Sequence, residues 1–257
     1  MTALIDPFSP PAPSEELARL HQRLLSRIQR RYQTVTEPRQ IGPATLTFTR
    51  VAEPDRVLDE VVDECDRIER ETGVRQQDPL HLPYWAEVWD SAAGIGAYLL
   101  ERASTSLPFA KKSVLDLGCG MGLSGTVCAA LGANVLMADL EPAPLLFARL
   151  NSLPWRHRVR LRRLDWQKDR LDERFDVIVG ADILYERKQW EFLDAFWRAH
   201  LAAGGEIILG EPGRMTGDTF LEWAPQRGWG LERTDFKVVT REAPVRVLRL
   251  WYSRKTS

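Results

Sequence analysis

The chain has 257 residues, with 35 lysines and arginines against 36 aspartates and glutamates, so its formal net charge is −1. At roughly 100–200 residues per domain, this length predicts one large domain or one domain with an extension. No apolar run approaches the ~20 residues of a membrane helix, and Met1 begins no secretory signal, so we expect a cytoplasmic protein without a membrane partner. The near-zero charge makes nucleic acid an unlikely partner, because it disfavours a purely electrostatic grip.

The cysteines and histidines predict neither disulfides nor a metal site. Cys65, Cys119 and Cys128 are too few and too scattered for a disulfide framework. The four histidines are far apart in the sequence, so we expect no zinc site and no other metal. This pattern is typical of a reducing compartment.

The first third of the chain differs from the rest. Residues 1–13 carry four prolines and predict a mobile tail. Residues 14–82 predict a mainly helical extension: a helix that begins after the N-cap Ser14, a short strand at Ala44–Val51, and an amphipathic helix over 54–71. The apolar residues expected to face inward on the second helix are Val57, Leu58, Val61, Val62, Cys65 and Ile68.

These two helices carry opposite charges. The basic residues of the first are Arg19, Arg23, Arg27 and Arg30, and the acidic residues of the second are Asp59, Glu60, Asp63, Glu64 and Asp66. Two interpretations stay open. Either both faces are solvated, or the basic helix and the acidic helix pack together.

From residue 113 onward, short apolar runs alternate with helical stretches. The runs lie at 113–117, 134–138, 158–164, 175–180 and 206–210, and a hairpin over 231–240 and 245–252 follows them. Strands that alternate with helices predict a parallel sheet covered on both faces. We therefore expect an α/β fold: a Rossmann-like, mostly parallel seven-stranded sheet with a C-terminal antiparallel hairpin, in a domain over residues 83–257.

A glycine-rich turn directly follows the first strand of this region: Asp116, Gly118, Cys119, Gly120 and Gly122. Glycines allow a sharp turn and a close approach of the backbone to a ligand. The spacing also fits the G-x-G-x-x-G pattern of dinucleotide sites, which alone is a weak signal. However, an acid just before the glycines suits a cofactor that has a positive ammonium group and no phosphate, as S-adenosylmethionine has.

Acidic residues end five of the predicted strands: Asp116, Asp139, Asp165, Asp182 and Glu211. Because ligands of open α/β sheets bind at the carboxyl ends of the strands, we expect these acids to converge on one site. Asp139 is placed to accept hydrogen bonds from ribose hydroxyls, although it could instead cap the next helix. Asp165 and Trp166 together could meet the edge and the face of an adenine.

These motifs resemble class I S-adenosylmethionine-dependent methyltransferases, from about Pro83 to the C-terminus. More narrowly, they resemble the methyltransferase-like protein lysine methyltransferases that carry an Asp-x-x-Tyr motif. The matching segments are VWD at 88–90, VLDLGCGMGLSG at 114–125, Asp139-Leu140, Trp166 and GADILY at 180–185.

The resemblance implies a role for each matched residue. The cofactor would be held by Trp89, Asp116, Gly118, Cys119, Gly120, Gly122, Asp139, Leu140, Asp165, Trp166 and Ala181. Asp182 and Tyr185 would border the channel of the acceptor amine and act as catalytic residues. The expected reaction moves a methyl group from S-adenosylmethionine to a lysine of a protein substrate and leaves S-adenosylhomocysteine.

Two alternatives remain at this point. The acceptor could be a small molecule or a nucleic acid, although the segment ADILY lacks the prolines typical of amino-methylating DNA enzymes. A binding module without catalysis is disfavoured, because both the glycine turn and the Asp-x-x-Tyr motif are intact.

Overall fold

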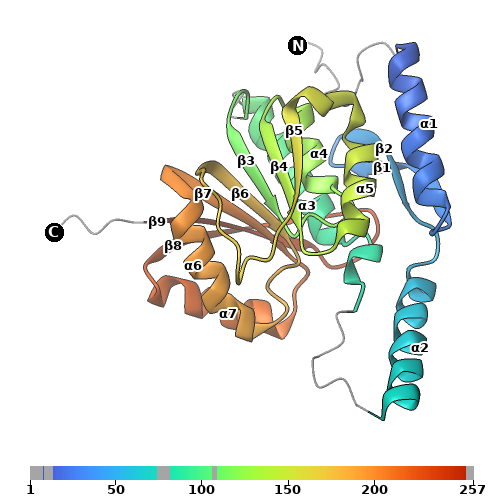
Figure 1. The fold of residues 1–257 in the computed structure, drawn as a ribbon. Helices are drawn as coiled ribbons and strands as arrows, with labels where there is room; N and C mark the ends of the chain where they lie inside the picture. Colours follow the sequence, from blue (N-terminus) through green and yellow to red (C-terminus); the bar gives the residue numbers. More distant parts are fainter. Residues whose placement is uncertain (1–7, 9–13, 74–81, 106–108, 253–257) are drawn as a thin grey trace.

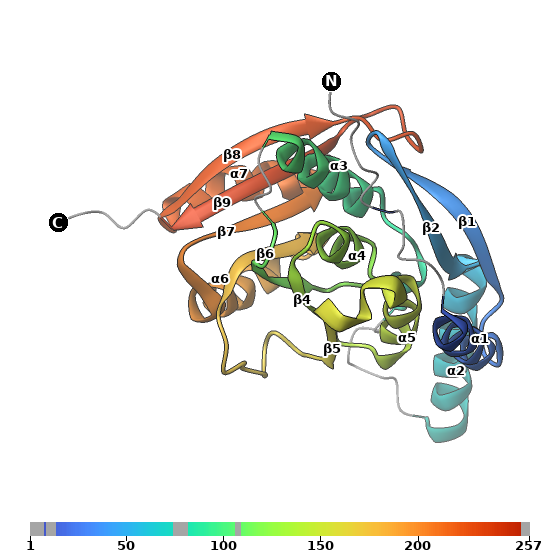
Figure 2. The same cartoon turned by 90° about the horizontal axis from the view of Figure 1, so that it is seen from above.

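A central seven-stranded sheet organises the molecule, in the strand order β5-β4-β3-β6-β7-β9-β8 (Figures 1 and 2). The computed structural model describes residue 8 and residues 14–73, 82–105 and 109–252. The first five strands of this sheet pair in parallel, and β9 lies antiparallel between β7 and β8. The predicted α/β fold with its C-terminal hairpin is therefore confirmed.

The strands of the sheet are β3 (Ser113–Leu117), β4 (Asn134–Asp139), β5 (Val159–Arg163), β6 (Phe175–Ala181), β7 (Leu201–Glu211), β8 (Trp229–Phe236) and β9 (Val245–Tyr252). Most strands of the sheet begin and end within two residues of the predicted positions, but β7 begins five residues earlier and β8 ends four residues earlier than predicted. The arginine-rich β5 is an edge strand, where charged side chains discourage pairing with another chain.

Helices cover both faces of the sheet and create two hydrophobic cores. One core packs against α3 (Asp90–Thr105), α4 (Leu123–Ala130) and α5 (Pro142–Asn151), and the other against α6 (Trp190–His200) and α7 (Met215–Gln226). Side chains of β3 alternate between them: Val114 belongs to the first core, and Leu115 and Leu117 belong to the second. Short 3-10 helices lie at η1 (Tyr84–Ala86), η2 (Leu153–Arg158) and η3 (Arg187–Gln189). None of the described helices is long and apolar enough to cross a membrane.

The N-terminal extension is less purely helical than predicted. It contains α1 (Glu15–Gln29), an antiparallel hairpin of β1 (Thr34–Ile41) and β2 (Ala44–Val51), and α2 (Pro54–Thr72). Ser14 caps α1 as expected, because its Oγ accepts a hydrogen bond from the Leu17 N–H at 3.2 Å. The sequence did not predict β1.

The extension shares its core with the sheet domain. Leu24 and Ile28 of α1 and Phe48 of β2 are buried in the same cluster as α4 and α5. The predicted mobile tail lies outside the described residues except for Phe8, which is 5% exposed and belongs to that cluster, so the prediction is wrong for Phe8.

The basic and the acidic helix do not pack along each other. Helix α1 packs against α5 and η2, whereas α2 contacts η1. Figure 1 shows α1 and α2 one above the other along the same edge of the molecule. No residue of α2 is buried, so the predicted inward apolar face is only partly covered.

One side chain joins the hairpin to the turn after β3. The buried Asn151 accepts a hydrogen bond from the Thr49 N–H at 2.8 Å, and its amide donates to the carbonyls of Thr49 and Met121, each at 3.0 Å. These three bonds satisfy backbone groups that no water reaches, so Asn151 holds the extension in register with the domain.

Asn151→Ala is expected to lower the free energy of unfolding by about 2–4 kcal/mol, because it leaves buried backbone groups without partners. Ser152→Ala is the matched control, since the buried Ser152 hydroxyl donates only within its own helix, to the Ala148 carbonyl. Urea denaturation measures both variants. If the two variants lost equal, small amounts of unfolding free energy, the bridging role of Asn151 would be contradicted.

Candidate functional site

The turn between β3 and α4 requires glycine. Gly118, Gly120 and Gly122 all have positive φ angles, and φ is 85° at Gly122. A β-carbon on Gly122 would lie 2.8 Å from the Cα of Ala148, which is backbone and cannot move aside easily. The turn therefore brings its backbone close to α5. Three of its N–H groups have partners within the protein: Cys119 donates to the Ala138 carbonyl, Gly122 to the Cys119 carbonyl and Gly120 to the Asp139 carboxylate.

Two carboxylates support this turn from the ends of β3 and β4. Asp116 is 1% exposed, and its Oδ2 accepts a hydrogen bond from the Gly125 N–H at 2.8 Å. Burial raises the pKa of Asp116 to about 7. Because it is closed off from the surface, Asp116 supports the start of α4 in this structure.

Asp139 is the more accessible of the two. Its Oδ2 accepts from the Gly120 N–H at 2.8 Å and its Oδ1 from the Glu141 N–H at 3.0 Å. Burial raises the pKa of Asp139 to about 6. The N-cap of α5 is Glu141, so Asp139 does not cap that helix. A carboxylate accepts about four hydrogen bonds, so two positions remain for a ligand.

Cys119 and Leu140 flank these groups. The Cys119 N–H donates to the Ala138 carbonyl at 2.9 Å, and burial raises the pKa of its thiol well above the ordinary value, so the thiol is unreactive. Leu140 is partly exposed, and its carbonyl accepts from Nε of Arg163 at 2.9 Å.

Trp166 lies beside the glycine turn. A β-carbon on Gly118 would lie 3.5 Å from its indole ring. The indole N–H donates to Gln189 Oε1 at 3.2 Å, which fixes the ring. The neighbouring Asp165 accepts from the Gln167 N–H at 2.9 Å and pairs with Lys168 at 3.2 Å. Asp165 therefore stabilises the turn that follows it, through Gln167 and Lys168.

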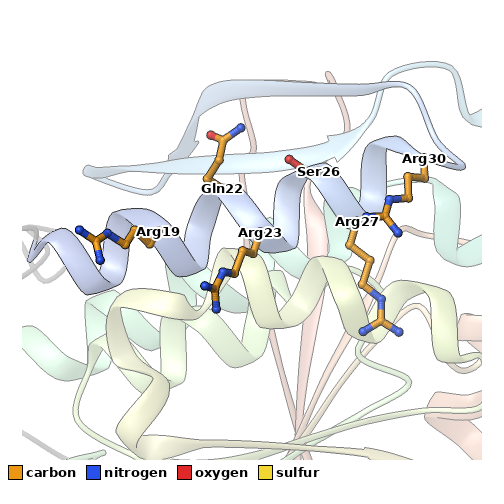
Figure 3. Close-up of a pocket in the computed structure, with 6 residues that line it drawn as sticks. All are labelled: Arg19, Gln22, Arg23, Ser26, Arg27 and Arg30. Atoms are coloured by element: carbon orange, nitrogen blue, oxygen red, sulfur yellow. The ribbon is translucent and has the colours of Figure 1, made fainter.

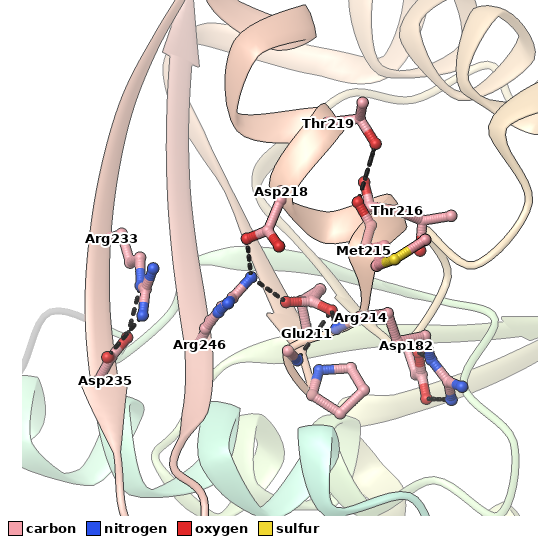
Figure 4. Close-up of polar contacts among 12 residues, drawn as sticks. Asp182, Glu211, Arg214, Met215, Thr216, Asp218, Thr219, Arg233, Asp235 and Arg246 are labelled. Carbon is pink, nitrogen blue, oxygen red and sulfur yellow. Dashed lines mark hydrogen bonds and ion pairs between the residues drawn. The ribbon is translucent and has the colours of Figure 1, made fainter.

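Asp182 is held by an arginine that the sequence analysis did not assign to the site. Its side chain is 5% exposed, and its two oxygens accept from Nε and Nη2 of Arg214 at 3.3 and 2.8 Å (Figure 4). The φ angle of Asp182 is 53°, which is unusual for a residue other than glycine. The segment after Asp182 is not helical, so Asp182 and Tyr185 are not one helical turn apart, and Asp182 caps no helix.

The backbone of Arg214 is fixed by another buried acid. Oε1 of Glu211, at the end of β7, accepts from the N–H groups of Gly213 and Arg214 at 2.9 and 2.5 Å. Arg246 pairs with Glu211 at 3.4 Å and with Asp218 at 2.7 Å (Figure 4). Glu211 therefore reaches the predicted edge of the sheet, where it positions the loop that carries Arg214.

Asp182 and Trp89 line the same cavity, of about 320 Å³. The guanidinium of Arg214 lies 5.5 Å from the centre of the Trp89 ring, whose N–H donates to the Tyr84 carbonyl at 2.9 Å. The residues that line the cavity are Trp89, Asp90, Ser91, Asp182, Pro212, Gly213, Arg214 and Arg241. Trp89, which was expected at the cofactor, and Asp182, which was expected at the amine channel, thus line one cavity, and Arg214 contacts both.

Tyr185 faces another tyrosine at the surface. Its ring centre lies 5.7 Å from that of Tyr84, and the two side chains are 40% and 46% exposed. Partial burial, together with the charges of Glu186 and Asp182, raises the pKa of Tyr185 to about 12, so its hydroxyl stays protonated at neutral pH.

The predicted residues thus form two neighbouring groups at the carboxyl ends of the strands. The glycine turn, Asp139 and Trp166 form one, and Trp89 and Asp182 form the other. Ile183 joins them, because its Cγ2 lies 2.9 Å from where a β-carbon of Gly118 would be. Ala181, at the end of β6, is partly exposed beside this junction. Among the described residues, no group of three or more His, Cys, Asp or Glu side chains is arranged to hold a metal ion.

Comparison with solved structures defines the fold class. The glycopeptide N-methyltransferase MtfA, solved with S-adenosyl-L-methionine, superposes with a TM-score of 0.54 at 17% identity, over 62% of this chain and 94% of that chain. This likeness shows the fold of an S-adenosylmethionine-dependent methyltransferase.

The family follows from the sequence of the same region. The family model described as lysine methyltransferase matches residues 81–222, so the chain belongs to the lysine methyltransferase family. Protein N-lysine methyltransferase METTL21A of Xenopus tropicalis is 37% identical over 142 residues, which are 52% of this chain and 63% of that relative. The electron transfer flavoprotein beta subunit lysine methyltransferase of Rattus norvegicus is 31% identical over 53% of each chain. The matches therefore span about half to two-thirds of the curated relatives.

The pKa of Asp139 predicts how the affinity for S-adenosylhomocysteine depends on pH. A charged carboxylate accepts stronger hydrogen bonds than a protonated one, so the affinity is expected to fall as the pH drops through about 6. Asp139→Asn is expected to bind S-adenosylhomocysteine about 1.5–3 kcal/mol more weakly at pH 8. Its affinity should also no longer fall as the pH drops through about 6, and this fall is the step measured below.

Calorimetric titration at pH 5 to 8 measures both effects. Asp176→Asn is the control, because Asp176 binds Ser113 at the opposite end of β3 and should keep the step. An unchanged step in Asp139→Asn would show that another group produces it.

Proposed function

We propose that this chain transfers a methyl group from S-adenosylmethionine to the amine of a lysine in a protein substrate. The observation that carries the proposal is the pairing of Asp182 and Trp89 around one cavity, with Ile183, the residue after Asp182, packed against Gly118 of the glycine turn, in a chain of the lysine methyltransferase family. The relatives' names support lysine as the methyl acceptor.

The residues present suit this cofactor. Asp139 has free acceptor positions for ribose hydroxyls, and Trp166 offers an aromatic face beside Gly118. Cys119, Gly120, Gly122, Leu140, Asp165 and Ala181 complete the proposed cofactor site, and Asp116 acts beneath it by holding the turn. When bound, the cofactor supplies a methyl group on a sulfonium, which is already a good leaving group.

The protein must then supply a neutral amine in the correct place. A lysine amine has a reference pKa of about 10.4, so it must lose a proton before it can attack. Trp89, Tyr84 and Tyr185 border the acceptor channel, and the loss of water around the amine when a lysine side chain fills that channel disfavours the charged ammonium. Asp182 orients the amine and accepts its proton, and Arg214 holds the Asp182 carboxylate in place until the acceptor enters.

We also propose that the protein acts in the cytoplasm, without membrane, metal or nucleic acid as a partner. Its cysteines support this: Cys65, Cys119 and Cys128 are free thiols, and the latter two are buried.

Incubation of the full chain with tritiated S-adenosylmethionine and a cell extract tests the reaction. After acid hydrolysis of the labelled protein, the tritium is expected in methylated lysine. The Asp139→Asn variant is the control for cofactor dependence. Label that enters nucleic acid, small molecules or methylated arginine would contradict lysine as the acceptor.

Two variants separate catalysis from stability. Asp182→Ala and Arg214→Met both break the same ion pair. A purely structural pair predicts a lower Tm for both variants, with the larger loss for Arg214→Met because it leaves the buried Asp182 carboxylate without its partner, and unchanged turnover per folded molecule. If Asp182 handles the proton, Asp182→Ala is expected to slow transfer at least ~10²-fold, and Arg214→Met to slow it much less.

Asp218→Ala is the matched control, because Asp218 pairs with Arg246 nearby but does not line the cavity. Tm, affinity for S-adenosylhomocysteine and turnover are measured on all three variants. An active, merely less stable Asp182→Ala protein would contradict the catalytic assignment.

A further inference from the structure

Two charged stripes of the N-terminal extension have the same spacing and opposite sign. Four arginines of α1 and its C-cap follow the pattern i, i+4, i+8, i+11, and so do four aspartates of α2. They are Arg19, Arg23, Arg27 and Arg30, and Asp55, Asp59, Asp63 and Asp66. At about 1.5 Å per residue, each stripe runs about 16 Å along one side of its helix.

These eight side chains are almost unpaired. All eight residues are exposed, and within the described part of the chain only Arg19 has an ion-pair partner, the exposed Glu15 at 3.2 Å. Five of the other charged residues of α2 do pair within the helix: Arg56 with Glu60, and Arg67 with Glu64 and Glu71. None of these pairs uses an aspartate of the stripe.

The arginine stripe borders a shallow pocket of about 490 Å³ on α1 (Figure 3). Gln22 and Ser26 lie beside the arginines and add hydrogen-bonding groups. Like charges at i, i+4 spacing destabilise a helix, so the stripe costs stability unless an anionic surface covers it.

The two stripes do not face each other within one chain. Helix α1 is anchored to the body through the buried Leu24 and Ile28, and α2 lies below it along the same edge in Figure 1. In Figure 2, seen from above, the two helices again lie at the same edge. Both stripes are exposed, and the two helices that carry them lie at one edge of the molecule, one beyond the other.

We propose that this surface binds a second copy of the chain, so that α1 of each copy lies antiparallel against α2 of the other. A two-fold axis that passes between α1 and α2 produces this arrangement, and the same patch then serves both subunits. This proposal is independent of the proposed methyl transfer.

The spacing fits antiparallel pairing. Arg19, Arg23, Arg27 and Arg30 would lie opposite Asp66, Asp63, Asp59 and Asp55 of the second copy. The two spacings, 4-4-3 and its reverse 3-4-4, differ by at most one residue, about 1.5 Å, which a long arginine side chain accommodates. The two-fold axis forms each of these pairs twice.

The proposed dimer should dissociate at high salt, because ion pairs between exposed side chains are individually weak and are screened by dissolved ions. Sedimentation velocity of the full chain is expected to show a dimer at about 20 mM NaCl and a monomer at about 500 mM NaCl, where the Debye length falls to a few ångströms.

Charge reversal tests the register. Arg23→Glu/Arg27→Glu and Asp59→Lys/Asp63→Lys each place like charges opposite one another, so each variant alone is expected to be monomeric at low salt, with the dimer weakened at least about tenfold. Neither variant removes an ion pair of the folded chain, so the Tm at about 500 mM NaCl, where the unmodified chain is also monomeric, should stay close to that of the unmodified chain. A 1:1 mixture of the two variants restores opposite charges at both contacts and is expected to form a heterodimer.

Arg162→Glu/Glu222→Lys is the matched control, since both residues are exposed and lie outside the stripes. This control should dimerise like the unmodified chain. A monomer at low salt, a dimer that resists the stripe reversals, or a mixture that stays monomeric would each overturn the proposal.

Discussion

The glycine turn after β3 depends on two buried or half-buried carboxylates that accept hydrogen bonds from its backbone and from the start of α4. Asp116 receives the Gly125 N–H and Asp139 receives the Gly120 N–H, both at 2.8 Å. Burial raises the pKa of each carboxyl, so their ionisation costs free energy that the backbone hydrogen bonds only partly offset. Asn151 then connects this turn to the N-terminal hairpin through the Met121 and Thr49 carbonyls. The extension, the turn and the cofactor site we propose thus form one hydrogen-bonded unit.

Most of the sheet domain could be predicted because its signals are local. Apolar runs mark the strands, and the glycines stand directly after the first of them. Helix α3 was not predicted, since Gly94 and Gly96 reduce helix propensity. The structure needs them: β-carbons there would lie 2.4 Å from Val245 and 2.6 Å from Ile41. Strand β1 was not predicted either, because it contains Pro38, which is unusual in a strand interior.

In the candidate site, too, the residues with a local sequence signal were predicted and those without one were not. The acids that end the strands were found because parallel strands bring their carboxyl ends to one edge. The Asp182–Arg214 pair was not, since its members are 32 residues apart and meet only when the loop after β7 folds back over Trp89. The motif ADILY gives no sign of that arginine.

The most direct test of this account is the choice of cofactor. Calorimetric titration of the full chain at pH 8 compares S-adenosylhomocysteine with NAD, the ligand that the G-x-G-x-x-G spacing would also allow. Asp139 carries its charge at this pH, and its two backbone hydrogen bonds leave acceptor positions for ribose hydroxyls. We predict one-to-one binding of S-adenosylhomocysteine and no heat from NAD. Tight binding of NAD, with no heat from S-adenosylhomocysteine, would contradict the account.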